Sequence, residues 1–146
     1  MPFRISIDID NSLEKFIREI HQCKGIKVSE LCIHQLISED PNLNHGIYVF
    51  KNKSDETYVG RCTSRSFVER IAAHFDNRDN AWMNTILKKI AQSKNSTIQE
   101  SYSYFLNSFE LVLIPFNTNL IEKTRINTLE KELINCIGTL NSRKRK

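Results

Sequence analysis

The sequence predicts a mixed α+β domain, and three observations indicate this class. Residues 46–60 contain two short β-rich runs around a polar turn, and residues 109–116 form a further β-rich run. Several other stretches carry apolar residues at helical spacing. The chain has 146 residues, of which 40% are hydrophobic and 26% charged, so it has the length of one domain and can bury a core without disulfide bonds.

The first forty residues predict a strand followed by helices. Isoleucines alternate with polar residues over 5–9, which is typical of a strand. Cap residues at 10–12 precede a predicted helix over 13–22, and a second short helix is predicted over 29–37. Pro41 then marks a turn, because the residue before a proline avoids the helical region. We therefore divide the chain into an N-terminal extension, residues 1–41, and a main domain, residues 42–142.

The main domain begins with a predicted β-hairpin. Its strands are residues 46–50 and 57–60, joined by the polar turn. A register centred near Lys53 would place Tyr48 opposite Tyr58 on one face. A slip of one residue would send the two tyrosines to opposite faces, so the sequence leaves both arrangements open.

Three helices and a third strand complete the prediction. Ser66 and Asn119 are helix-capping residues, and Gly138 is a typical helix stop. The predicted elements are a helix from Ser66 to about Asn77, a helix over 81–92, a polar loop over 94–101, a strand over 109–116, and a long helix from Asn119 to Ile137.

Composition favours a cytoplasmic protein. The four cysteines are scattered without a CxxC pair, which indicates reduced thiols: Cys23, Cys32, Cys62 and Cys136. Residues 1–10 contain acids and no long apolar core, so we expect no signal peptide. The apolar run 111–114 is too short to span a bilayer, and no membrane association is expected.

The net charge of +4 is carried by the last four residues. A basic tail, residues 143–146, suits a polyanionic partner such as nucleic acid. A solvated tail without a partner is the alternative. The tail is the four residues Arg143, Lys144, Arg145 and Lys146.

A carboxylate lies within the apolar stripe of the last predicted helix. Glu130 falls on the same helical face as Leu129 and Leu133, whereas Glu132 falls outside it. A carboxylate directed at a core is costly unless it is paired with a base or bound to a cation. A buried ion pair with an arginine and a metal ligand are therefore both open.

Arg70 and His74 are neighbours on the helix that follows the hairpin. Their i, i+4 spacing places both side chains on one flank of the apolar stripe. A guanidinium beside an imidazole suits the handling of a phosphate. An exposed arginine and a structural histidine form the plainer alternative.

A zinc site near the N-terminus is a further possibility. His21, Cys23, Cys32 and His34 are possible ligands, but their spacing is unlike that of paired-ligand zinc motifs. The sequence therefore favours other roles for these residues.

Together these motifs resemble the GIY-YIG nuclease family. Its two strand motifs stand here as Gly46-Ile47-Tyr48 and Tyr58-Val59-Gly60. The family's Arg-x-x-x-His pair matches Arg70 and His74, and its glutamate matches Glu130 followed by Leu133 and Ile134. Asn141 in a Leu-Asn pair matches the closing asparagine. The resemblance covers residues 45–141 and leaves the extension uncovered.

The resemblance implies a small three-stranded antiparallel sheet flanked by helices, and a metal-dependent endonuclease acting on double-stranded DNA. It implies that Glu130 holds Mg²⁺ or Mn²⁺ and that Tyr48 accepts the proton of the attacking water. The other implied catalytic residues are Tyr58, Arg70, His74 and Asn141, and Arg61 is expected to contact the nucleic-acid backbone. A non-catalytic nucleic-acid-binding protein or an adaptor that keeps the fold is the alternative.

Overall fold

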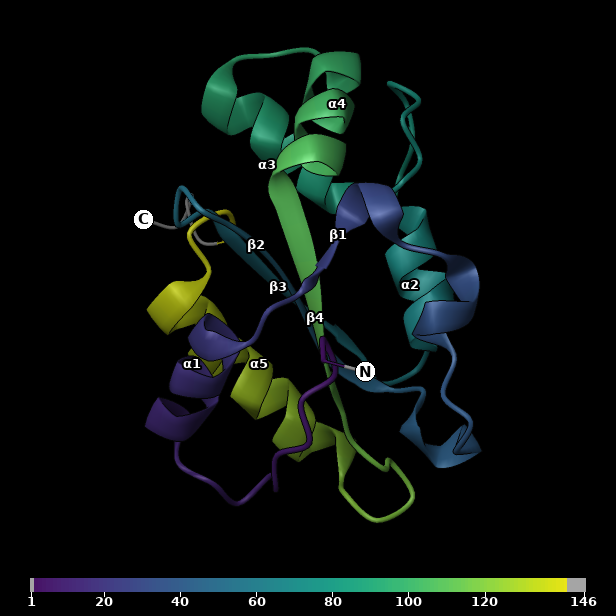
Figure 1. The fold of residues 1–146 in the computed structure, drawn as a ribbon, viewed down its shortest axis with the longest axis vertical. Helices are drawn as coiled ribbons and strands as arrows, with labels where there is room; N and C mark the ends of the chain where they lie inside the picture. Colours follow the sequence, from purple (N-terminus) through teal and green to yellow (C-terminus); the bar gives the residue numbers. More distant parts are fainter. Residues whose placement is uncertain (1, 142–146) are drawn as a thin grey trace.

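Four strands form one antiparallel sheet in the computed structural model, which describes residues 2–141 (Figure 1). The strand order is β1-β4-β2-β3, so β3 and the short β1 are the edges. The predicted three-stranded sheet is therefore too small by one strand. The strands are β1 (Ile26–Lys27), β2 (Gly46–Asn52), β3 (Thr57–Cys62) and β4 (Phe109–Pro115).

Five α-helices within residues 2–141 cover the two faces of the sheet, and the figure shows α1 beside α5 and α2 away from them (Figure 1). The helices are α1 (Leu13–Gln22), α2 (Phe67–Ala73), α3 (Thr85–Lys94), α4 (Ile98–Ser108) and α5 (Lys123–Ile137), with 3-10 turns η1 (Val28–Glu30), η2 (Ile33–Leu36) and η3 (Pro41–Leu43). Among the described residues, no helix is long and apolar enough to cross a membrane.

Alternation along the strands divides the core into two clusters. Tyr48 and Phe50 of β2 point to the face covered by α2, α3 and α4. Ile47 and Val49 point to the opposite face, where they pack against α1 and α5. The first forty residues contribute to both clusters, with Val28 in the first and Phe16 in the second.

The predicted N-terminal strand is wrong. Phe3, Ile5 and Ile7 are buried in alternation, but the segment pairs with β4 only through a single parallel bridge at Arg4. Two backbone hydrogen bonds with Leu113 flank that bridge, and the chain then leaves the sheet. The fourth strand is β1, a two-residue segment too short to give a periodic signal.

The helix predictions are correct for α1 and need correction elsewhere. Ser12 caps α1 as expected. The helix predicted over 29–37 is two 3-10 turns. The polar segment 94–101 was expected to be a loop, but α4 begins inside it, with a capping box between Thr97 and Glu100.

The remaining helices differ from prediction mainly at their ends. The helix after Ser66 ends at Ala73, and His74 is its C-cap. The next helix starts at Thr85, four residues later than predicted. The last helix starts at Lys123 with Glu122 as N-cap, and it stops at Gly138 as expected.

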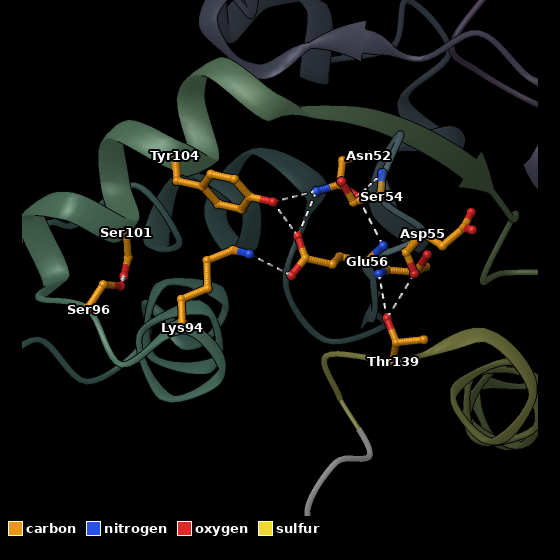
Figure 2. Close-up of polar contacts among 10 residues, drawn as sticks. Asn52, Ser54, Asp55, Glu56, Lys94, Ser96, Ser101, Tyr104 and Thr139 are labelled. Carbon is orange, nitrogen blue, oxygen red and sulfur yellow. Dashed lines mark hydrogen bonds and ion pairs between the residues drawn. The ribbon is translucent and has the colours of Figure 1, made fainter.

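A polar cluster ties the turn of the β2–β3 hairpin to the two helices beside it (Figure 2). Tyr104 of α4 donates a hydrogen bond to Glu56, and Asn52 donates a second one. The ammonium of Lys94 lies 3.5 Å from the other oxygen of Glu56 and 4.5 Å from the centre of the Tyr104 ring. These bonds lower the pKa of Glu56 against the effect of its burial, so it is charged at neutral pH.

Candidate active site

Two tyrosines of the hairpin lie on the same face of the sheet. Tyr48 pairs with Gly60, and Tyr58 pairs with Phe50. The register differs by two residues from the one centred near Lys53, and a shift of two residues keeps both side chains on one face. Of the two arrangements left open by the sequence, the one with both tyrosines on the same face is therefore present. Their ring centres are 6.5 Å apart, and both rings are buried.

The glycines of the two strand motifs are required by close contacts. A Cβ atom on Gly60 would overlap the ring and hydroxyl of Tyr48. Gly46 has a φ of 149°, and a Cβ atom there would overlap the carbonyl oxygen of Ile114. Gly60 therefore allows the Tyr48 ring to lie directly against the edge strand.

His74 is fully buried and joins Tyr48 to α3. Its Nε2 atom lies 2.7 Å from the hydroxyl oxygen of Tyr48. Its Nδ1 atom accepts a hydrogen bond of 3.2 Å from the backbone N–H of Ile86. A neutral imidazole that accepts at Nδ1 carries its proton on Nε2, so His74 donates to Tyr48.

Burial sets the charge state of this pair. Burial, and to a smaller extent the nearby Arg70, lowers the pKa of His74 well below its usual value, so the ring is neutral at pH 7. Burial also raises the pKa of Tyr48 well above 10, and Arg70 opposes this shift. The resting site therefore contains a neutral phenol held by a neutral imidazole.

Arg70 projects from α2 towards the start of α3. Its guanidinium donates to the carbonyl oxygen of Met83 at 3.1 Å and to the hydroxyl of Thr85 at 3.5 Å. Its charge lowers the pKa of both Tyr48 and Tyr58 against the effect of burial, and Thr85, to which it donates, also forms a side-chain hydrogen bond with Tyr58. The expected grouping of Arg70 and His74 with the two tyrosines is thus present on this face.

Glu130 is buried on α5, which packs on the other face of the sheet. Its Oε1 accepts a hydrogen bond of 2.8 Å from Arg61, the residue after Gly60 on β3. The carboxylate is 11% exposed and the arginine side chain 42% exposed, so the pair reaches the surface at the sheet edge. Of the two possibilities left open by the sequence, the structure shows the ion pair with an arginine, and this pair lies where solvent can reach it.

The negative charge of Glu130 affects the pKa of groups on the face of the sheet that carries Tyr48 and Tyr58. Burial raises the pKa of Cys62 to about 12, Arg70 opposes the shift, and Glu130 adds to it. Glu130 also contributes to the raised pKa of Tyr48 and of Tyr58, after burial as the main cause. The negative charge of Glu130 therefore disfavours the charged form of both phenols, although the carboxylate belongs to the helix on the opposite face of the sheet.

Asn141 holds the outer edge of β3. Its side chain accepts from the backbone N–H of Val59 and donates to the carbonyl oxygen of the same residue, both at 2.8 Å. The backbone N–H of Leu140 donates to the carbonyl oxygen of Thr57, and the hydroxyl oxygen of Thr139 accepts from the backbone N–H of Thr57. The asparagine thus positions the strand that carries Tyr58 and touches none of the other candidate side chains.

Comparison of the chain with protein-family models, curated proteins and solved structures found no match.

The residues present fit a magnesium or manganese ion better than zinc. Within residues 2–141 no group of three or more His, Cys, Asp and Glu side chains could hold a metal, and His21, Cys23, Cys32 and His34 form no such group. Mg²⁺ keeps several waters and is commonly held by one or two carboxylates together with substrate phosphates. Glu130 is one carboxylate of this kind. Arg61 bonds to its Oε1 and not to its Oε2, so Oε2 is the oxygen that would bind an ion.

Three features of the site were not predicted from the sequence. The pairing of Arg61 with Glu130, the carbonyl of Met83 that holds Arg70, and the N–H of Ile86 that fixes the His74 ring all join residues far apart in the chain. Of these residues, only Arg61 is marked as a site residue by the sequence, because it directly follows the Tyr-Val-Gly motif. The basic tail, residues 143–146, lies outside the described residues.

Proposed function

We propose that this chain is a GIY-YIG-type endonuclease that hydrolyses phosphodiester bonds in double-stranded DNA. The observation that carries the proposal is the hydrogen-bonded chain from Ile86 through His74 to Tyr48. Arg70 lies four residues before His74 on α2, and its guanidinium is held at the start of α3. Tyr48 can accept a proton only as a phenolate, and the hydrogen bond from His74 and the positive charge of Arg70 favour that form against the effect of burial.

The phosphate would be held by cationic and hydroxyl groups around the end of β3. Arg70 has a planar guanidinium that can bind the non-bridging oxygens of the phosphate, and Tyr58 can donate its hydroxyl to one of them. Arg61 is 42% exposed, so its remaining N–H groups can reach a neighbouring phosphate. Asn141 supports these contacts by fixing the edge of β3.

Hydrolysis forms one P–O bond from water and breaks the P–O bond to the leaving sugar oxygen. The phenol of Tyr48 first loses its own proton to solvent. The phenolate then takes the proton of the attacking water, and the leaving oxygen takes a proton from solvent. His74 donates from Nε2 throughout and remains neutral, because its burial disfavours the charged form. His74 therefore acts as a positioning residue for Tyr48, rather than as a proton acceptor.

Glu130 would hold Mg²⁺ or Mn²⁺ through its open oxygen, with Arg61 fixing the orientation of the carboxylate. The ion, when bound, supplies positive charge that stabilises the leaving oxygen and the phosphate.

A non-catalytic DNA-binding or adaptor protein is favoured by one observation, which is that Glu130 already has an arginine partner. Replacing the Glu130 carboxylate by an amide distinguishes a DNA-binding protein from an endonuclease. In a binding protein, Glu130→Gln leaves the affinity for DNA unchanged and there is no cleavage to lose. In the proposed enzyme, the same change abolishes cleavage.

The test is single-turnover cleavage of an end-labelled DNA duplex in Mg²⁺ or Mn²⁺ by the wild type, Glu130→Gln and Glu132→Gln. Glu132 is exposed two residues along the same helix, so it is the matched control for charge and position. We expect Glu132→Gln to cleave like the wild type and Glu130→Gln to be inactive with an unchanged melting temperature. Equal rates for the two variants would overturn the role of Glu130, and an inactive wild type would overturn the proposed function.

A further inference from the structure

One tryptophan stands out on the surface beside the candidate site. Trp82 is the only tryptophan of the chain, and its side chain is 89% exposed. It lies in the loop between α2 and α3, where Met83 is also partly exposed at 40%. A large aromatic side chain held in water is available for an apolar partner.

The loop that carries Trp82 is held in place by contacts of the residues before and after the tryptophan. Ala81 before it is buried, and the carbonyl of Met83 after it accepts the hydrogen bond from Arg70. Asn84 is fully buried and donates to the carbonyl oxygens of Asp76 and Arg78. The exposure of the indole is therefore a property of a fixed loop.

A hollow of about 450 Å³ adjoins the indole. Arg78, which lines this hollow, donates two hydrogen bonds to the carboxylate of Asp76, at 2.6 and 2.9 Å. The positive charge of Arg78 is therefore compensated by Asp76. The surface thus offers a flat aromatic ring and apolar groups rather than a free positive charge. The lining includes Ala73, Asp76, Arg78, Ala81, Trp82 and Met83.

This chemistry suits a nucleobase better than a phosphate. A base has an aromatic face that stacks on an indole, whatever the sequence. The guanidinium proposed to bind the scissile phosphate is bonded to the residue next to Trp82, so a base near that phosphate would lie within reach of the ring. A base inside a continuous duplex is stacked on its neighbours and has no free face, whereas a mismatched or bulged base leaves the stack at little cost.

We propose that Trp82 is a stacking site for an unpaired nucleobase next to the scissile phosphate, which makes the chain selective for DNA with bulged or mismatched bases. The inference rests on the proposed function, since it places that base relative to the phosphate held by Arg70. Base–aromatic stacking predicts that loss of the ring weakens binding about 5- to 140-fold.

The test compares a DNA duplex carrying one central bulged adenine with the same duplex without it, in EDTA so that neither is cleaved. Binding is followed by the anisotropy of labelled DNA and by the intrinsic fluorescence of Trp82. We expect the bulged duplex to bind more tightly and to quench the fluorescence, and the continuous duplex to quench it little at saturation. Unchanged fluorescence with both duplexes saturated would overturn the proposal.

Three variants show whether the ring is responsible. Trp82→Ala should lose the preference for the bulged duplex, and Trp82→Phe should keep most of it. Leu120 is 82% exposed in the loop before α5, so Leu120→Ala controls for loss of an exposed apolar side chain and should bind like the wild type. Equal losses for both duplexes with Trp82→Ala would overturn selectivity for an unpaired base.

The outcomes separate this inference from the proposed function. Cleavage in Mg²⁺ without quenching overturns the stacking site and leaves the nuclease intact. Quenching by the bulged duplex without cleavage supports the stacking site and overturns the nuclease. Self-association that Trp82→Ala abolishes, with no response to DNA, would assign the surface to a second copy of the chain and overturn the proposal.

Discussion

Replacing Tyr48 with phenylalanine removes a single oxygen atom from the centre of the candidate site. The ring that packs against Gly60 and Phe50 remains. The lost oxygen is the partner of His74 Nε2–H, which is fully buried and cannot turn to water. The substitution therefore tests a proton acceptor and a buried hydrogen bond together.

The two effects have different magnitudes. General-base assistance typically contributes about 10²–10⁴-fold, so the single-turnover rate should fall by that factor. A buried donor without its partner costs about 1–3 kcal/mol. At about 4 °C per kcal/mol for a chain of this length, the melting temperature should fall by roughly 4–12 °C.

The rate is measured with enzyme in excess over a labelled duplex, at a temperature where all variants are folded. Tyr104→Phe is the matched control, because Tyr104 loses a hydrogen bond to Glu56 at the hairpin turn (Figure 2). Its side chain is partly exposed, so we expect a loss of about 1 kcal/mol and no change in rate. Tyr58→Phe should be milder than Tyr48→Phe, since Arg70 also holds the phosphate.

Cleavage by Tyr48→Phe at the wild-type rate, together with a lower melting temperature, would contradict the role of Tyr48 as proton acceptor. Tyr48 would then be a core residue that satisfies His74, and it would have no part in proton transfer. A fall in rate in Tyr104→Phe as large as in Tyr48→Phe would show instead that activity follows stability.

Three further predictions concern the neighbours of Tyr48. Arg70→Ala should lower the single-turnover rate by about a hundredfold or more, because a preorganised charge is lost; a change in affinity alone would make Arg70 a binding residue. Gly60→Ala should cost about 1–3 kcal/mol in urea unfolding and lower the rate, because the added methyl overlaps the Tyr48 ring; a variant as stable as the wild type would contradict that contact. Burial lowers the pKa of His74 well below its usual value, so below pH 6.5 only the unfolded chain takes up this proton and stability is lost as the pH falls. Wild type should therefore lose about 1 kcal/mol more than His74→Gln between pH 6.5 and 5.5, and equal losses would show that His74 titrates normally.

Sequence pattern predicted the parts of this structure that depend on local signals. Ser12 caps α1, Gly138 ends α5, and the apolar stripe of α5 places Glu130 at a buried position. Each of these follows from a residue and its neighbours within one element. The capping box of Thr97 and Glu100 was such a signal too, but the polar composition around it favoured a loop.

The features that were not predicted depend on contacts between distant segments. β1 is a strand only because Ile26 and Lys27 lie beside β4. The hairpin register depends on its turn, where Asp55 has a φ of 61° and the Asn52 side chain accepts from two backbone N–H groups. The His74 proton is placed by a backbone N–H from another helix, which no spacing within the chain reveals.

The central claim is tested most directly by the rate at which the wild-type chain cleaves supercoiled plasmid after treatment with EDTA, measured before and after Mg²⁺ is added back. We expect no cleavage in EDTA and full recovery with Mg²⁺, because in the proposed enzyme an ion at Glu130 would supply the charge that stabilises the leaving oxygen. Equal cleavage in EDTA and in Mg²⁺, or none under either condition with DNA still bound, would contradict the central claim.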